Sequence, residues 1–314
     1  MTTPTRIAVI GAGYMGRFHA EKFAALTDAE LVAVVDADAA RAKAVADALG
    51  CEAATDHRAV LPRIDAACVA VPTALHHAVA RDCLEAGVHV LVEKPLARTL
   101  EEADALMALA AAKGRALQVG HLQRFNPAFR ALAADGGRPL FIDIERLAPF
   151  KSRGADVDVI LDLMIHDLDL VLALARAPVE HVSASGFRVL TGAIDIANAR
   201  IEFADGCVAS LSASRVSQSP VRKLRVFRHD AYVSADLQGQ KLRHVRKGAD
   251  GIEESEQSFA RADELRLQAE DFLRAVRDRA APLVDGGQGR RVLALALQIG
   301  RLVHDRLQKH AEAR

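Results

Sequence analysis

The first 120 residues alternate short, almost wholly apolar runs with alanine-rich segments of helical periodicity, and this alternation most restricts the fold. The apolar runs predict strands at residues 6–10, 31–36, 66–71, 88–92 and 116–119. The segments between them predict helices at residues 14–25, 39–49, 75–86 and 100–113. Apolar strands separated by helices form parallel sheets that are covered on both faces. The sequence therefore predicts a doubly wound α/β domain over residues 1–120.

A different pattern follows residue 120 and predicts a second, α+β domain over residues 121–314. A long helical stretch covers residues 155–176, and helices at residues 261–279 and 290–308 close the chain. Strand-like runs occur at residues 140–146, 181–190, 194–203, 207–215, 224–228 and 232–237. Tight turns such as Ala204-Asp205-Gly206, and an expected exposed charged hairpin over residues 241–256, predict an antiparallel sheet. The pattern leaves open whether the last helix packs back on the first domain.

The turn after the first predicted strand carries three spaced glycines. Gly11, Gly13 and Gly16 form G-x-G-x-x-G between a strand and a helix, the context in which this motif binds a dinucleotide. Asp36 ends the second strand 20 residues later, where a carboxylate accepts hydrogen bonds from ribose hydroxyls and repels a 2′-phosphate. These features favour NAD over NADP, a preference that Arg41 would weaken. The alternative is a simple glycine turn, with Asp36 capping the next helix.

Several polar residues follow the later strands, at the edge where open α/β sheets bind ligands. Lys94, in Glu93-Lys94-Pro95, follows the fourth strand and is placed to meet a substrate oxygen; the alternative is an ordinary surface lysine. Pro72-Thr73 and His76 follow the third strand, where they would either contact the cofactor or begin a helix. Arg124, within residues 120–127, would bind an anionic substrate group or form a salt bridge at the domain junction.

Asp162 and His166 lie four residues apart on the long, otherwise apolar helix, so we expect them on one face. A carboxylate can fix the tautomer of a histidine and support it as a general base. The alternatives are a satisfied core histidine or a water-facing helix edge, with Asp167 and Asp169 as further residues of a polar side. A metal site is the weakest interpretation, because no third ligand has a clear spacing.

Composition excludes other classes of function. The chain has 41 Lys and Arg against 41 Asp and Glu, 4% aromatic residues and no Trp, which argues against nucleic acid as a partner. We expect no membrane partner, because no apolar stretch approaches the ~18 residues that span a bilayer. Four scattered cysteines without a C-x-x-C pair predict reduced thiols, a cytoplasmic protein and no metal site.

Together these motifs resemble the Gfo/Idh/MocA oxidoreductases, in the order and spacing of that family. The resemblance implies an N-terminal NAD-binding Rossmann domain and a C-terminal α+β domain with an open, mostly antiparallel sheet. It also implies a cis peptide at Lys94-Pro95 and a homodimer or homotetramer formed through the open sheet. Met164 stands where many sugar and inositol members have Gly, which would reshape the pocket floor.

The resemblance assigns candidate roles residue by residue. Catalytic roles fall to Lys94, Asp162 and His166. The cofactor would be held by Gly11, Gly13, Tyr14, Met15, Gly16, Asp36, Arg41, Pro72, Thr73, His76, Glu93 and Lys94. The substrate would be held by Lys94, Arg124, Asn126 and His166.

Residues 120–127 and 164–169 are most similar to those of bacterial UDP-N-acetylglucosamine 3-dehydrogenases. This implies oxidation of a sugar 3-hydroxyl to a ketone by NAD, with a PLP-dependent transaminase next in lipid A assembly. Either His166 or Lys94 would take the hydroxyl proton. The alternatives are another sugar, an inositol or a small imine as substrate, or a cofactor-binding regulator without turnover.

Overall fold

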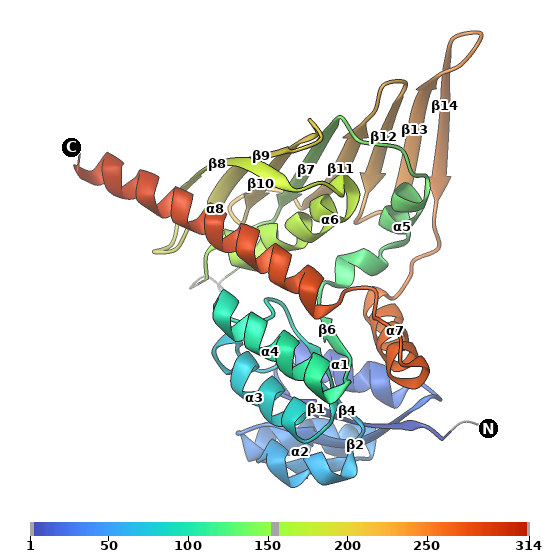
Figure 1. Cartoon of the computed structure of the whole chain (residues 1–314), viewed down its shortest axis with the longest axis vertical. Helices are drawn as coiled ribbons and strands as arrows, with labels where there is room; N and C mark the ends of the chain where they lie inside the picture. Colours follow the sequence, from blue (N-terminus) through green and yellow to red (C-terminus); the bar gives the residue numbers. More distant parts are fainter. Residues whose placement is uncertain (1–2, 152–156, 313–314) are drawn as a thin grey trace. The chain divides into compact units, whose positions relative to one another are not determined.

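The computed structural model describes residues 3–151 and 157–312, and its contacts divide the chain into two compact units (Figure 1). The first unit contains residues 1–125 and 263–293, and the second contains residues 126–262 and 294–314. This division differs from the expected boundary at residue 120, because residues 263–293 belong with the first unit. The physical reason is burial: Phe272 and Leu273 share one apolar core with Ile7 and Phe23.

The first unit is built on a six-stranded parallel sheet, which confirms the doubly wound prediction. Its strands are β1 (Thr5–Ile10), β2 (Ala29–Val35), β3 (Glu52–Ala54), β4 (Ala66–Val69), β5 (His89–Val92) and β6 (Leu117–Val119). They lie in the order β3-β2-β1-β4-β5-β6, and every pairing is parallel. All four residues of β4 and of β5 are buried, as expected for central strands covered on both faces.

Helices flank these strands, and two of them begin and end at clear sequence signals. They are α1 (Tyr14–Ala24), α2 (Ala39–Leu49), α3 (Thr73–Glu85), α4 (Leu100–Lys113) and α7 (Glu264–Asp278), with 3₁₀ turns η1 (His57–Ala59), η2 (Leu61–Arg63) and η3 (Leu122–Phe125). Asp38 caps α2 by accepting from two backbone N–H groups, and Gly50 ends it in the left-handed conformation. Thr99 caps α4 by accepting from the Glu102 N–H, and Gly114 ends that helix in the left-handed conformation.

The second unit contains an eight-stranded, mostly antiparallel sheet, as expected. Its strands are β7 (Phe141–Leu147), β8 (Val179–Phe187), β9 (Ile196–Phe203), β10 (Val208–Ser214), β11 (Val221–Phe227), β12 (Ala231–Asp236), β13 (Lys241–Lys247) and β14 (Ile252–Ser258). The order is β14-β13-β12-β11-β7-β10-β9-β8, and among these eight strands of the described chain only β7 and β10 pair in parallel. The expected charged hairpin forms β13 and β14, and every residue of β14 is exposed.

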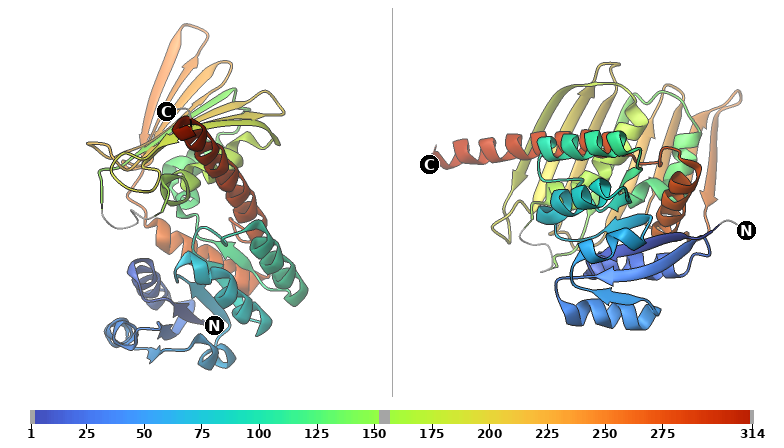
Figure 2. Two further views of the ribbon diagram at one scale, coloured as in Figure 1. Left: turned by 90° about the vertical axis from the view of Figure 1, so that its left-hand side faces the viewer. Right: turned by 60° about the horizontal axis from the view of Figure 1, so that its bottom comes forward.

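Helices cover one face of this sheet. They are α5 (Pro127–Ala134), the π-helical turn η4 (Ile160–Met164), α6 (Ile165–Ala175) and the later part of α8 (Gly286–Glu312). Both views of Figure 2 show α5 and α6 on the same side of the strands. Burial alternates along β9, which matches a sheet with one covered face. Helix α8 crosses β8 so closely that a Cβ on Gly186 would come within 2.9 Å of the Val303 side chain.

Two expectations about the long helical stretch need correction. The stretch is not one α-helix, because η4 precedes α6, and residues 155 and 156 lie outside the described part of the chain. Asp167 and Asp169 are not on a polar side, because both are buried. Asp167 accepts bonds of 2.6–3.0 Å from the Arg146 guanidinium on β7. This buried ion pair joins α6 to the sheet.

All four cysteines are free thiols. Among the helices of residues 3–151 and 157–312, none has the length and apolar character needed to cross a bilayer.

The buried Arg146–Asp167 pair gives a prediction about stability. Burial raises the pKa of Asp167 even though Arg146 opposes the shift, so Arg146→Ala would leave a carboxyl group without its buried partner. We expect a loss of roughly 3–5 kcal/mol in the free energy of unfolding. Urea unfolding followed by circular dichroism measures it, since the chain has no Trp. The matched control is Arg243→Ala, which breaks the exposed Arg243–Glu254 pair in the same sheet. Equal losses in the two variants would contradict the prediction.

Candidate active site

The glycine turn brings β1 and α1 into very close contact. Gly11 has φ +98°, and a Cβ there would lie 2.5 Å from the Ala70 carbonyl oxygen. A Cβ on Gly16 would lie 1.7 Å from the Gly11 carbonyl oxygen. Gly13 differs, because its Cβ would meet no atom within 4 Å, and Gly13 begins α1 without a side-chain cap. The turn therefore leaves open space beside a helix N-terminus, as a bound pyrophosphate requires.

Asp36 is held beside this turn by backbone donors. Its Oδ2 accepts a 2.8 Å bond from the Ala12 N–H, and its Oδ1 accepts a 2.9 Å bond from the Asp38 N–H. The Arg41 Nη1 lies 3.4 Å from both oxygens, and its side chain is half exposed. The Asp36 carboxylate is thus fixed at the end of β2, where a ribose diol would reach it. The exposed Arg41 side chain beside it is free to change its conformation.

The turn after β5 carries Glu93-Lys94-Pro95, and the Lys94-Pro95 peptide is cis, which confirms that expectation. Glu93 is buried; its Oε1 lies 2.8 Å from His19 Nε2, and its Oε2 accepts a 3.1 Å bond from the Lys94 N–H. Burial opposes charge on His19, but Cys68 and Glu93 outweigh it and raise the pKa of His19 to about 10. Burial also opposes charge on Glu93, but His19 and Lys94 lower its pKa.

Two more buried histidines lie near Lys94. His76 on α3 places Nδ1 2.8 Å from the Pro95 oxygen and Nε2 2.9 Å from the Val71 oxygen, so it joins the turns after β4 and β5. Burial lowers its pKa. His121 follows β6; burial, and then the charge of Lys94, lower its pKa to about 3. With its pKa lowered to about 3, His121 adds no positive charge beside Lys94.

His121 was not among the residues predicted for the site. The sequence could have indicated His121, because it directly follows Gly120 at the carboxyl end of the last strand of the parallel sheet, where ligands bind. Gly120 itself packs on Glu93, since a Cβ there would lie 3.0 Å from the Glu93 Cα and Oε2. A larger residue at position 120 would displace the turn that carries Lys94.

The second unit carries the other two candidate catalytic residues. Asp162 lies in the π-helical turn and His166 in the first turn of α6, and both are partly buried. A π-turn inserts one residue into a helix and is frequent at functional sites. It begins near Asp158, whose carbonyl accepts from the Asp162 N–H at 3.0 Å. The turn changes the angle between Asp162 and His166 from that of an ordinary α-helix.

Polar contacts fix the start of this turn. Asp158 Oδ1 accepts a 2.8 Å bond from the Ile194 N–H, and its Oδ2 lies 2.8 Å from His304 Nε2 on α8. Asp195 next to Ile194 is fully buried and accepts from three successive N–H groups, beginning with Val189. Burial opposes its charge, but these donors lower the pKa of Asp195 to about 2. The loop between β8 and β9 thus supports the π-turn.

The remaining predicted residues are placed as follows. Tyr14 and Met15 open α1, with Tyr14 exposed. Thr73 is the first residue of α3 and Pro72 its N-cap, which has no side-chain capping bond. Arg124 lies half-buried in η3 in the first unit.

Asn126 has a structural role in the second unit, and its contact with substrate stays a prediction. It is fully buried, and its Oδ1 caps α5 by accepting from the Ala128 and Phe129 N–H groups. Its Nδ2 donates a 2.9 Å bond to the Leu237 carbonyl. The sequence contained the signal, because Asn before Pro127 matches an N-cap followed by proline at the first helical position.

The described residues contain no group of three or more His, Cys, Asp or Glu side chains arranged to hold a metal ion. The chemistry of the first unit is instead that of a dinucleotide site, with an open glycine turn, a fixed carboxylate and a lysine at one edge of the sheet.

This fold and site define a class of enzyme, and comparison with known proteins agrees. Residues 5–121 match the oxidoreductase family with an NAD-binding Rossmann fold, and residues 134–233 match the Gfo/Idh/MocA C-terminal domain. The chain belongs to the Gfo/Idh/MocA oxidoreductases, which confirms the family, the fold class and the NAD cofactor predicted from sequence.

Particular relatives narrow the similarity. The chain is 42% identical to UDP-N-acetylglucosamine 3-dehydrogenase of Acidithiobacillus ferrooxidans over 311 residues, covering 97% of this chain and 99% of the relative. The crystal structure of that enzyme superposes with a TM-score of 0.92, covering 96% and 98% of the two chains. The scyllo-inositol 2-dehydrogenase (NAD(+)) of Bacillus subtilis is 33% identical over 237 residues, 69% of each chain.

The second and third glycines of the turn, Gly13 and Gly16, give two contrasting predictions. Gly16→Ala places a methyl group against the Gly11 carbonyl and should cost about 1–3 kcal/mol in the free energy of unfolding. Gly13→Ala meets no protein atom, so its stability should stay near that of the parent, while its methyl group occupies the space expected for the pyrophosphate and weakens NADH binding. Urea unfolding and NADH fluorescence titration measure the two effects. Retained NADH affinity in Gly13→Ala would contradict this placement of the cofactor.

Proposed function

We propose that the chain oxidises the 3-hydroxyl of UDP-N-acetylglucosamine to the 3-keto sugar with NAD. The observation that carries this proposal is the 42% identity to such an enzyme along essentially the whole of both chains. The inositol dehydrogenases match only about two thirds of the chain at similar or lower identity, which favours the nucleotide sugar over a polyol.

The cofactor fits the first unit. Gly13 leaves the approach to the α1 N-terminus open, and the N–H groups there would bind the pyrophosphate. Asp36 would accept hydrogen bonds from the adenosine ribose, and Arg41 would adjust to it. NAD supplies the hydride acceptor when bound. The remaining chemistry, removal of the hydroxyl proton and stabilisation of the developing alkoxide, belongs to side chains of the chain.

Lys94 is the group in the first unit best suited to the substrate oxygen. Its backbone N–H donates to the Glu93 carboxylate, and the other oxygen of that carboxylate contacts His19. These two contacts fix the turn that carries Lys94. His121, whose pKa is lowered to about 3, places no second cation beside Lys94. An ammonium there would stabilise the alkoxide as the hydride leaves.

His166 is proposed to act on the same hydroxyl, with Asp162 orienting it. The proton passes to His166 directly while Lys94 stays an ammonium, or it passes first to an uncharged Lys94 amine and then to His166. Asp162 would favour the tautomer and charge that this transfer requires. Arg124 is proposed to bind an anionic group of the substrate, such as its diphosphate.

The biological setting follows from the product. A 3-keto sugar nucleotide is a substrate for amination, so we propose a PLP-dependent transaminase as the next enzyme, within lipid A assembly in the cytoplasm. We also propose a homodimer or homotetramer formed through the second sheet. The exposed Phe187 and Ile252 on its strands support an interface there.

The catalytic proposal is tested with Lys94→Ala and His166→Ala, assayed with UDP-N-acetylglucosamine and NAD. Loss of a proton-transferring group should lower kcat by about 10²–10⁴-fold in each variant. Exposed residues of the same types provide the controls, Lys113→Ala and His181→Ala, which should keep the parental rate. NADH titration shows that each variant still binds cofactor. Near-parental turnover in both Lys94→Ala and His166→Ala would sink the assignment.

The same assay, run with scyllo-inositol and myo-inositol, separates the substrates. Oxidation of an inositol with no reaction of the nucleotide sugar would overturn the substrate proposal but retain the dehydrogenase. Tight NADH binding without reduction of NAD by any of these compounds would identify a regulator instead.

Cofactor preference is tested with Asp36→Ser. Removing the carboxylate ends its repulsion of a 2′-phosphate and leaves Arg41 able to bind that group. The ratio of kcat/KM for NAD over NADP should fall at least about tenfold. Asp38→Ser is the control, because Asp38 also meets Arg41 but caps α2. An unchanged ratio in Asp36→Ser would show that Asp36 does not select the cofactor.

A further inference from the structure

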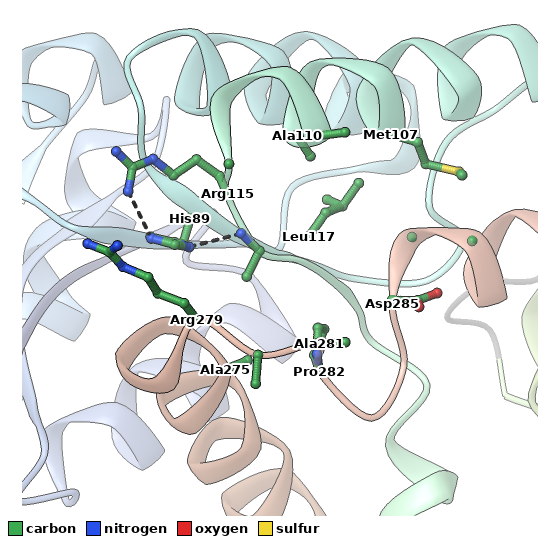
Figure 3. Close-up of a pocket in the computed structure, with 16 residues that line it drawn as sticks. His89, Met107, Ala110, Arg115, Leu117, Ala275, Arg279, Ala281, Pro282 and Asp285 are labelled. Atoms are coloured by element: carbon green, nitrogen blue, oxygen red, sulfur yellow. Dashed lines mark hydrogen bonds between the residues drawn. The ribbon is translucent and has the colours of Figure 1, made fainter.

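A pocket in the first unit lies apart from the candidate active site described above (Figure 3). Its volume is about 440 Å³. It is bounded by the amino ends of β5 and β6, by α4 and α7, and by the segment that leads into α8. Figure 3 shows His89, Arg115 and Arg279 together at one end, with Leu117 and Met107 farther along.

This pocket is at the opposite edge of the parallel sheet from the glycine turn. β5 begins with His89 at the pocket and ends with Val92, directly before Glu93 and Lys94. At 3.3 Å per residue, the strand separates the two edges by roughly 10 Å. Because dinucleotides bind at the carboxyl edge, a ligand here would be a separate one.

The charged end of the pocket has an excess of positive groups. Within residues 3–151 and 157–312, no ion pair of 4.0 Å or less joins Arg115 or Arg279 to a carboxylate oxygen. Arg115 lies over Gly87, where a Cβ would come 3.6 Å from its Nη2. Asp285 also lines the pocket, but its Oδ1 accepts a 2.8 Å bond from the Gln288 N–H at the start of α8.

His89 shows that an acceptor is needed at this end. It is 8% exposed; its Nδ1 lies 2.9 Å from the Ala116 backbone nitrogen and its Nε2 lies 3.1 Å from Arg115 Nη1. Both neighbours are donors, and a neutral imidazole has one accepting nitrogen. If Nδ1 of His89 accepts from the Ala116 N–H, then Nε2 carries the proton, and this N–H points at the Arg115 guanidinium. An anion beside these two groups would accept a hydrogen bond from each and remove the conflict.

The rest of the wall is apolar. Met107, Ala110, Leu117, Ala275 and Pro282 line the pocket away from the charged end. We propose that this pocket binds an organic anion, a phosphate or carboxylate joined to a short apolar chain. The anionic group would lie between His89, Arg115 and Arg279, with the apolar part along α4 and α7.

The proposal is tested by calorimetric titration of hexyl phosphate into the full-length protein saturated with NADH, so that the dinucleotide site is filled. We expect saturable one-to-one binding, weakened at least tenfold in the Arg115→Gln, Arg279→Gln double variant. Arg277→Gln, on the same helix as Arg279 but outside the pocket, should bind within twofold of the parent. Absence of saturable binding, or parental affinity in the double variant, would overturn the proposal.

A second variant addresses the histidine directly. His89→Asn keeps an acceptor near the Ala116 N–H but removes the Nε2–H donor, so affinity should fall severalfold while the melting temperature is retained. Parental affinity would show that His89 does not contact the anion. Hexanol and inorganic phosphate should each bind at least tenfold more weakly than hexyl phosphate. Equal binding of hexanol would refute charge recognition, and equal binding of phosphate would refute the apolar part.

Discussion

The close approach of Gly16 to the Gly11 carbonyl is the constraint on which the catalytic end of the first unit depends. It fixes the direction of α1, and α1 carries His19 into contact with the buried Glu93 carboxylate. Glu93 in turn binds the backbone N–H of Lys94. One steric requirement in the cofactor turn therefore also determines where the candidate catalytic lysine stands. The same turn leaves the α1 N-terminus uncapped, so cofactor binding and lysine placement share a single structural cause.

The second unit uses buried polar groups for an equivalent purpose. A π-turn is wider than an α-turn, and its irregular end needs support from outside the helix. Asp158 supplies this support by bonding to Ile194, while the buried Arg146–Asp167 pair holds the following α6 on the sheet. These charges are costly to bury, and their partners make them tolerable. The backbone that carries the candidate His166 thus lies between two fixed segments.

The local pattern of the sequence was sufficient for most of the fold but not for its long-range contacts. Apolar runs identified every strand of the first sheet except β3, which is a three-residue edge strand with little apolar content. Periodicity found α7 but could not show that Phe272 enters the first core, since an amphipathic helix can pack on either unit. Periodicity also cannot detect the single extra residue of a π-turn. Motif spacing located Lys94 and Asp36, whereas the contacts of His19 with Glu93 required the folded chain.

The histidines of the first unit show why residue type alone does not assign a role. His19 faces a carboxylate and has a raised pKa, whereas burial lowers the pKa of His76 and, together with the charge of Lys94, that of His121. His89, at the other edge, has a pKa lowered to about 4, first by burial and then by Arg115. Near Lys94 this arrangement keeps one carboxylate and few cations, which suits a lysine that must meet a developing negative charge. At the amino edge, Arg115 and Arg279 lie together, and no ion pair within residues 3–151 and 157–312 joins either of them to a carboxylate, so the two ends of one strand are suited to different ligands.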